Sequence, residues 1–371
     1  MRTPHLTLGL LLLCHGTSQA QSDSVPSGPP PGYRTRVTVL PYATYTPQTK
    51  VQFGVAGGVQ FKWPGAVLDP ATRPSYFAGN VAYTTKGQWL TYFENSLYTA
   101  SNRWWLFGRA SVGYFPLFYY GVGPHTTRAD TNLMKHRFII LEGKALRRVN
   151  GDLYAGVHYR LESFFDLDWQ FPGRIPADLP GGYGGHSSGL GVTAQLDSRN
   201  STTTPTRGRF LLFDYLRQAA WLGSDFDYDQ VAVDARLYLP VRSGRDVLAL
   251  NLYGEWNGAE VPIQSMARLS DYSGTILARG VYLGRFRDRH EAIAQADYRG
   301  HLKGRFGYVV FGSAGNVFGS RGAGLFDKLK YTYGAGLRFN VNPADPLNLR
   351  VDYTLTSFGE SGLSLGAAEA F

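Results

Sequence analysis

The sequence predicts an all-β protein, and three observations support this prediction. Alternation of apolar and polar residues continues almost without interruption from Thr35 onward, and no convincing amphipathic helix breaks it. The 371 residues include 45 Gly, 24 Tyr and 22 Phe, a composition that favours many short strands and turns. Beyond the N-terminus, no unbroken apolar run reaches the length of a membrane-spanning helix.

The first twenty residues have the pattern of a secretory signal peptide. Arg2 gives a weakly positive start, Leu6 to Leu13 is apolar, and Ser18-Gln19-Ala20 is a small-x-small cleavage site. Cys14 is the only cysteine, so removal of residues 1–20 would leave a chain without disulfides or cysteine-ligated metals. A lipoprotein site at Cys14 is the less favoured alternative.

Residues 21–34 form a leader rich in Ser and Pro, which predicts disorder. The leader is too short to fold as a domain. The remaining residues, 35–371, are predicted to form one β domain.

Long alternation is the main feature of the predicted strands. It is clear in residues 152–163, 231–240, 331–340 and 347–356. In the last of these, one face carries Leu347, Leu349, Val351, Tyr353 and Leu355, and the other carries Asn348, Arg350, Asp352 and Thr354.

Two architectures give such alternation: a soluble sandwich, whose apolar faces form the core, and a membrane barrel, whose apolar faces meet lipid. The strands are about ten residues or longer, which matches a tilted bilayer crossing. Short turns at Lys86-Gly87 and Asn150-Gly151 alternate with long connections at 115–135, 164–186 and 257–277. Aromatic residues gather at strand ends, as in membrane girdles. We therefore predict a transmembrane antiparallel β-barrel of about 16 strands.

The C-terminus supports the same prediction. The chain ends on Phe371 after the alternating residues Leu363, Leu365 and Ala367, an ending common in outer-membrane barrels. The last strand is predicted over residues 362–371. Glu369 would then lie on the apolar face near the membrane interface, where a charge costs little and needs no function.

The segment from Ala278 to Arg289 is the densest in arginine and glycine. Its four arginines repel one another unless acids or water surround them. Gly280 and Gly284 allow the backbone to bend and to approach other parts of the chain closely. The segment is either a solvated surface loop or a loop that folds back into a polar cavity.

Three further segments resemble the barrel domain of the BamA/TamA-type outer-membrane superfamily, the bacterial surface antigen family. They are an opening hairpin from Leu40 to Gly54, the Phe118–Gly123 element, and Gly189 to Gly208 with its Asp-x-Arg and Pro-x-x-Gly motifs. The resemblance covers nearly the whole chain after the leader. It implies an outer-membrane location.

The resemblance also implies that the loop between strands 11 and 12 tucks into the barrel and carries a Val-Arg-Gly-aromatic motif. Its residues here would be Arg279, Gly280, Tyr282, Gly284, Arg285 and Arg287. The family arginine contacts two acids, and the positions that correspond to its partners are Asp297, Phe311, Ser313 and Gly315. Ser313 replaces the second acid, so the arginine would keep one charged partner.

In the family, the first and last strands join weakly and leave a seam. The last strand here has small residues at alternate positions, namely Gly362, Ser364 and Gly366. We expect no periplasmic POTRA domain ahead of this barrel. The implied partners are outer-membrane lipid and lipopolysaccharide, and beyond these client outer-membrane proteins, a separate periplasmic partner or a homo-oligomer.

Motifs of known chemistry are absent from the sequence: it has no Gly-x-Ser-x-Gly, His-Glu-x-x-His or Walker loop. His158 shares a polar strand face with Arg160 and Glu162 and is interpreted as a wall residue rather than a base. The net charge of +9 comes with acids and arginines interspersed, so no nucleic-acid partner is expected. We expect no cofactor, metal or enzymatic activity. A role in assembly or translocation is the first hypothesis, and a passive pore or structural barrel is the alternative.

Overall fold

The computed structural model describes residues 5–8, 34–46, 50–69, 71–269, 277–341 and 347–371. Its architecture is one large sheet with sixteen long strands. These are β2 (Arg36–Thr46), β3 (Lys50–Phe61), β4 (Ser75–Thr84), β5 (Trp89–Tyr98), β6 (Trp104–Tyr114), β8 (Asn132–Asn150), β9 (Leu153–Trp169), β10 (Gly185–Asp197), β11 (Gly208–Gln218), β12 (Tyr228–Val241), β13 (Asp246–Asn257), β16 (His290–Lys303), β17 (Phe306–Phe318), β18 (Lys330–Asn340), β19 (Asn348–Thr356) and β20 (Ser361–Ala367).

Shorter elements complete the chain. Two short strands, β1 (His5–Leu8) and β7 (Leu117–Tyr119), join the large sheet, while β14 (Ala267–Arg268) and β15 (Arg287–Asp288) pair with each other. Single turns of 3-10 helix lie in the connections at η1 (Pro64–Ala66), η2 (Ala100–Asn102), η3 (Arg128–Asp130), η4 (Pro172–Arg174), η5 (Ala220–Leu222) and η6 (Ser320–Gly322). No helix among the described residues is both long and apolar enough to cross a membrane.

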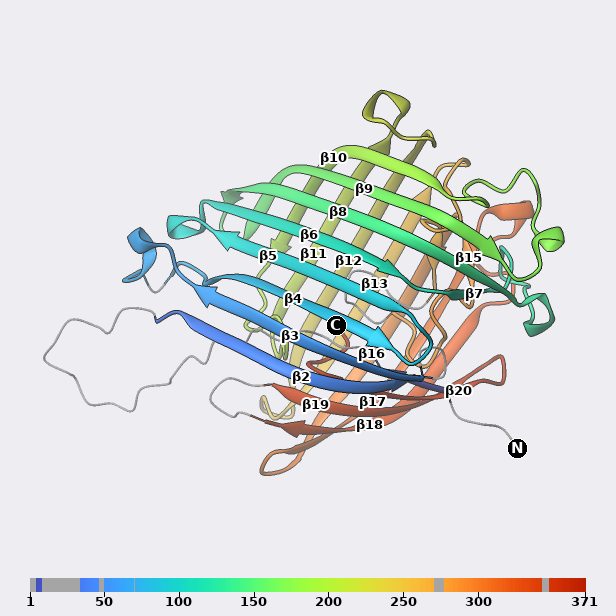
Figure 1. Ribbon diagram of the computed structural model, residues 1–371. Helices are drawn as coiled ribbons and strands as arrows, with labels where there is room; N and C mark the ends of the chain where they lie inside the picture. The colour runs from blue at the N-terminus through green and yellow to red at the C-terminus, as the bar shows by residue number, and fades with distance from the viewer. Residues whose placement is uncertain (1–4, 9–33, 47–49, 70, 270–276, 342–346) are drawn as a thin grey trace, which may run out of the picture.

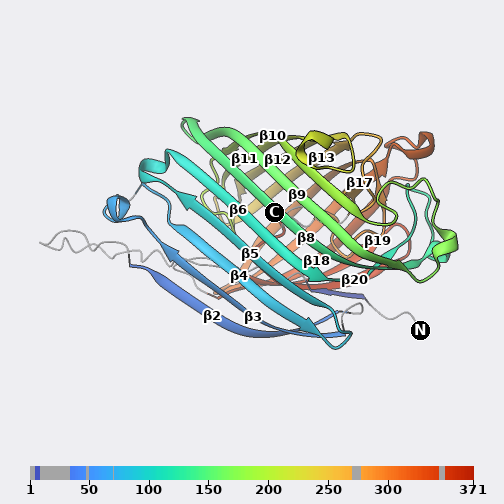
Figure 2. The same ribbon diagram turned by 45° about the horizontal axis from the view of Figure 1, so that its top comes forward.

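Each long strand pairs antiparallel with the next long strand along the chain, from β2 to β20. The sheet curves round, so that β2 to β6 lie in front of β11 to β13 in Figure 1. Figure 2 shows the same curvature from a second direction. The prediction of an antiparallel sheet of about sixteen long strands is confirmed, and β13 and β16 are the eleventh and twelfth of these.

The two faces of the sheet decide between sandwich and barrel. On β18, Tyr333 and Leu337 are 54% and 61% exposed, whereas Thr332 and Arg338 on the opposite face are 3% and 4% exposed. On β19, Val351 is exposed and Asp352 is fully buried. Apolar side chains therefore cover the outside and polar ones line the inside. A soluble sandwich would place them the other way round.

The first and last long strands meet differently from the others. Across the described residues, β20 pairs antiparallel with β19 on one edge and in parallel with β1 on its other edge, and no residue of β20 is paired with one of β2. The partners run from His5 opposite Gly362 to Leu8 opposite Leu365. β1 lies within residues 1–20, and the signal peptide expected there remains a prediction. Cleavage after Ala20 would expose this edge of β20.

Because successive long strands run in opposite directions, their connections lie at two ends of the barrel. The loop end carries the longer connections 115–131, 170–184 and 258–289, and the turn end carries short ones such as 151–152 and 304–305. The prediction that short turns alternate with long connections holds only in part. β4 runs toward the loop end, so the short Lys86-Gly87 turn lies among the long connections. Conversely, the connection 198–207 lies at the turn end but is long.

Some predictions fall on residues outside the described ranges. Of the signal segment only His5–Leu8 is described, and of the leader only Arg34. Pro47 in the opening hairpin and residues 270–276 of the long loop are likewise outside.

Candidate functional site

The candidate site is the part of the β13–β16 loop from Leu277 to Arg289, called here the arginine segment. The Nη2 of Arg279 lies 2.6 Å from each carboxylate oxygen of Asp297 on β16. Its guanidinium also stacks over the ring of Phe311 on β17, 4.1 Å from the ring centroid. Arg279 is only 2% exposed, so this is a buried ion pair on the polar face of the sheet.

A second acid near Arg279 comes from a strand that the family pattern did not indicate. Asp352 on β19 lies 3.9 Å from Nη1 of Arg279 and is fully buried. Ser313, at the position predicted for the second acid, instead shares a 2.7 Å hydrogen bond with Thr332. Gly315 faces Ile293 on the neighbouring strand, where a side chain would clash. Asp352 thus stands where the replaced acid would act.

Gly280 brings the arginine segment against the last two strands. Its φ of 75° is in the left-handed region, which favours glycine. A Cβ at Gly280 would lie 2.7 Å from Cβ of Thr354 on β19, and a Cβ at Gly362 on β20 would lie 2.9 Å from Cα of Gly280. The segment therefore fits only because both positions lack a side chain.

The next residues contact the Phe118–Gly123 element of the β6–β8 connection. The backbone N–H of Phe118 donates to the hydroxyl of Tyr282 at 3.3 Å. The ring of Tyr282 lies 6.0 Å from that of Phe118 and 5.8 Å from that of Tyr120. Gly123 donates its N–H to the carbonyl of Arg287 at 2.8 Å. Two motifs from the sequence, far apart in the chain, thus pack together.

The other arginines of the segment have separate partners. Arg285 lies 3.4 Å from Glu360 and donates to the carbonyl of Thr126 at 3.2 Å. Arg287 donates to the carbonyl of Ile263 at 2.8 Å, and burial together with the charge of Arg268 lowers its pKa to about 10. Gly284 turns the chain between these contacts with a φ of 73°. Arg289 donates to the carbonyl of Gly319. Four cations can share one segment because each is placed on a different acceptor.

The earlier half of the same loop reaches the opposite wall. Ser265 donates its hydroxyl to Glu162 on β9, and Gln264 donates to the carbonyl of Gly181 at 2.7 Å. Apolar residues at the loop end form a small core around it, which contains Tyr119, Met134, Trp169, Ile175, Tyr228, Val261, Ile263 and Met266. The loop therefore spans the polar face from β9 to β19.

The last four residues, Ala368–Phe371, form a C-terminal tail that leaves the sheet. The predicted strand to Phe371 was wrong: β20 ends at Ala367, and Ala368 has a φ of 63°, which breaks the alternation. Phe371 is buried against Tyr238 and Val247, and its carbonyl accepts from Arg299 at 3.0 Å. In both ribbon views the C-terminus lies inside the outline of the barrel (Figures 1 and 2).

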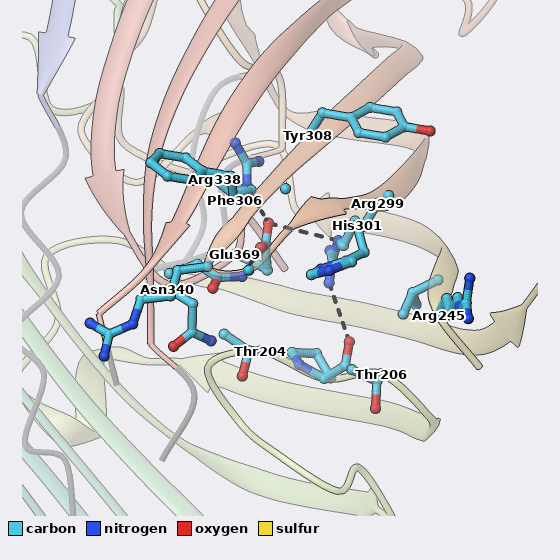
Figure 3. Close-up of a pocket in the computed structure, with 17 residues that line it drawn as sticks. Thr204, Thr206, Arg245, Arg299, His301, Phe306, Tyr308, Arg338, Asn340 and Glu369 are labelled. Atoms are coloured by element: carbon cyan, nitrogen blue, oxygen red, sulfur yellow. Dashed lines mark hydrogen bonds and ion pairs between the residues drawn. The ribbon is translucent and has the colours of Figure 1, made fainter. Parts of the chain in front are cut away.

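The predicted interface position of Glu369 was also wrong. Its carboxylate lies 2.9 Å from Nε of Arg338 and 3.8 Å from Nε of Arg299, and it accepts from Asn348 at 2.8 Å. Figure 3 shows Glu369 between the two arginines. Because the backbone turns at Ala368, the side chain of Glu369 points to the interior instead of to lipid.

A polar pocket of about 290 Å³ lies beside the tail at the turn end. Figure 3 shows the side chains that line it, among them Arg245, Arg299, Arg338 and Asn340. Thr204 and Thr206, from the connection 198–207, line the same pocket. The tail is tied to that connection because Glu369 donates its N–H to the carbonyl of Thr203 at 2.9 Å.

His158 on β9 lies in a separate buried network. Its Nδ1 is 2.9 Å from Asp214 and its Nε2 is 3.2 Å from Glu142. Lys144 lies 3.4 Å from both acids. Both ring nitrogens thus face carboxylates of the wall.

Comparison with known proteins places this geometry in a fold class. No protein-family model matches the chain, and no curated protein matches it. Among solved structures, it is similar to BamA from Haemophilus ducreyi lacking POTRA domains 1–3, with a TM-score of 0.57, 12% identity, and coverage of 90% of this chain and 70% of that one. It is also similar to CdiB from Acinetobacter baumannii, with a TM-score of 0.57, 10% identity, and coverage of 91% and 66%.

The chain therefore has the fold of an outer-membrane-type β-barrel. More particularly, the fold is that of the BamA-type barrel, as the sequence resemblance predicted. The chain spans about two thirds of each of these two structures.

Proposed function

We propose that this chain resides in the bacterial outer membrane, in contact with lipid and lipopolysaccharide. The exposed apolar faces of the strands and the likeness in fold to BamA and CdiB support this location. The loop end would face outward, since barrels of this kind have short periplasmic turns and longer outer loops. The test is direct: the purified protein should stay folded in detergent and aggregate when detergent is removed. A folded, soluble chain without detergent would refute the location.

The proposed activity is assembly or translocation of other outer-membrane proteins through the edge of β20. The observation that carries it is the pairing of that edge: among the described residues its partner is the short parallel β1, and no residue of β20 is paired with one of β2. Removal of β1 by the predicted cleavage after Ala20 would leave this edge unpaired, and an unpaired strand edge is a template for a further strand. The partners would be client barrels, a separate periplasmic protein or a second copy of the chain.

The second candidate is a structural barrel without client handling, or a passive pore. The structural form is favoured by the β13–β16 loop, which contacts β9 through Ser265 and Glu162 and β16 through the buried Arg279–Asp297 pair. The tail is likewise held to β18 by the buried Glu369–Arg338 pair. Depletion of the protein in its host, followed by quantification of the outer-membrane proteome, separates these functions. Broad loss of other barrels, restored by the wild-type gene, supports assembly. An unchanged proteome supports the structural barrel.

The proposal also assigns no enzymatic activity to the chain. His158 supports this because both of its ring nitrogens are directed at carboxylates rather than at a nucleophile. A panel of ester, peptide and phospholipid substrates should give no turnover above that of a His158→Gln variant. Turnover that the variant loses would contradict the assignment.

A further inference from the structure

The outer face of the barrel carries a groove of about 820 Å³ across β11, β12, β13, β16 and β17, called here the outer groove. Two rows of outward side chains border it, and strand register aligns them. The first row is Arg209, Leu237, Leu250, Ala296 and Gly312, and the second is Leu211, Ala235, Leu252, Ala294 and Ala314. Five strands at the usual spacing make the groove about 19 Å long.

Small residues make the far half of the groove deep. Ala294, Ala296, Gly312 and Ala314 follow one another on β16 and β17, where the neighbouring strands carry leucines and tyrosines on the same face. Leu252 and Tyr333, on either side of this floor, are 58% and 54% exposed. The groove is therefore a depression between two ridges, and its walls are almost entirely apolar.

The groove climbs along the wall. Arg209 is the second residue of β11, which starts at the turn end, while Gly312 lies near the middle of β17. Leu250 on β13 lies between these two heights. Because the rows follow the hydrogen-bonding direction and the strands are tilted, the groove rises from the rim at the turn end toward the middle of the wall.

The lower end of the groove is cationic. Arg209 is exposed on the outer face, and within the described part of the chain its guanidinium has no ion pair. Arginine binds phosphate through paired N–H donors, so a phosphate at the rim would complement this charge. An apolar groove that begins at an arginine matches a molecule with an anionic head and a long apolar chain.

We propose that the outer groove is a binding site for one glycerophospholipid, with its phosphate on Arg209 and an acyl chain over Ala294, Ala296 and Gly312. The inference rests on the proposed membrane location, since the lipid would come from the leaflet at the turn end. A second copy of the chain is the competing occupant of this face, and its binding would appear as a dimer. The site is separate from the interior network around Arg279.

The test uses the full chain in a phospholipid-free detergent, titrated with dipalmitoyl-phosphatidylglycerol and followed by native mass spectrometry. The wild type should bind one molecule. Ala294→Phe, which fills the floor, should abolish this binding. Arg209→Gln should weaken binding of the phospholipid about tenfold. Dipalmitoylglycerol, which has no phosphate, should bind Arg209→Gln and the wild type equally. Inorganic phosphate alone should not bind.

Ala335→Phe is the matched control, because Ala335 is exposed on the outer face of β18 but lies outside the groove. It should bind lipid as the wild type does. Equal lipid binding by Ala294→Phe and the control, or a dimer that Ala294→Phe disrupts, would overturn the proposal. Heat-modifiable migration of each variant on gels confirms that it is folded. A chain that folds without detergent would refute the membrane location instead, so the two failures are distinguishable.

Discussion

The arginine segment and the C-terminal tail both cross the polar interior, but the sequence signals only the first. The arginine segment carries a local pattern of arginine and glycine, and Gly280 turns it with a φ of 75°. The tail turns at Ala368, which has no such pattern, and it continues an alternation that predicts a strand. The difference shows that a turn made by glycine can be read from sequence, whereas one imposed by tertiary contacts cannot.

Two acids connect the two segments. Asp297 lies 2.6 Å from Arg279 and 3.3 Å from Arg299, and Arg299 lies 3.8 Å from Glu369. Asp352 lies 3.9 Å from Arg279 and 2.5 Å from Arg338, and Arg338 lies 2.9 Å from Glu369. Asp352 thus connects the arginine segment to the tail through a chain of buried ion pairs. Mutations on the two sides of Asp352 are therefore expected to be coupled.

The largest effect is expected from Arg279→Ala. It leaves Asp297 buried without its closest cation, which should lower the free energy of unfolding by about 3–5 kcal/mol. Denaturant titration in detergent, together with heat-modifiable migration on gels, measures this loss. Arg217→Ala removes the exposed pairs with Asp227 and Asp229, each of which should contribute about 0.2–1 kcal/mol. Equal stability of the two variants would contradict docking.

Phe371→Ala tests the tail and should cost about 3 kcal/mol, because Phe371 is buried in a small core with Tyr238 and Val247. Phe326, which is 82% exposed at the loop end, provides the control. Phe326→Ala should leave stability unchanged. Should both variants unfold at the same denaturant concentration, the tail is not packed inside.

Glu369→Gln should lower stability by about 1–3 kcal/mol, less than Arg279→Ala, because Arg338 keeps Asp352 and Arg299 keeps Asp297. Asp178→Asn, at an exposed loop position, is the control. A position of Glu369 at the membrane interface would predict almost no change. The double variant with Arg279→Ala should deviate from additivity, and strict additivity would argue against a link between the two segments through Asp352 and Asp297.

The smallest effect is expected from Ser313→Ala. It removes the hydrogen bond to Thr332 and should cost about 1 kcal/mol. Protease resistance of the arginine segment should not change, because the hydrogen bond of Ser313 joins β17 to β18 and does not involve the loop. Increased cleavage within residues 277–289 would show that Ser313 supports docking after all.

Much of the fold could be predicted because alternation is a local property. Residues 347–356 show which side of β19 faces inward, and the same reading gave the sixteen long strands and the place of the long loop between β13 and β16. Asp297 was found as a partner of Arg279 because it lies on the next strand of the family pattern.

The contacts that sequence reasoning missed are those between strands far apart in the sheet. The alternation placed Asp352 on the polar side of its strand. It could not show that Arg279, in the β13–β16 loop, lies close both to Asp297 on β16 and to Asp352 on β19. Glu369 was misplaced for a related reason. Its direction depends on the backbone at Ala368, and that turn is stabilised by contacts with Thr203, Arg338 and Asn348 rather than by the local residues.

The contacts of the arginine segment with the β6–β8 connection have a consequence for how the chain folds. Arg285 and Thr126 are 159 residues apart, and Tyr282 and Phe118 are 164 apart. Closing such distant contacts is slow, and it requires both halves of the chain to be in place. We therefore expect the arginine segment to insert late in folding, and a barrel halted before this step should have its strands but leave residues 277–289 open to proteases.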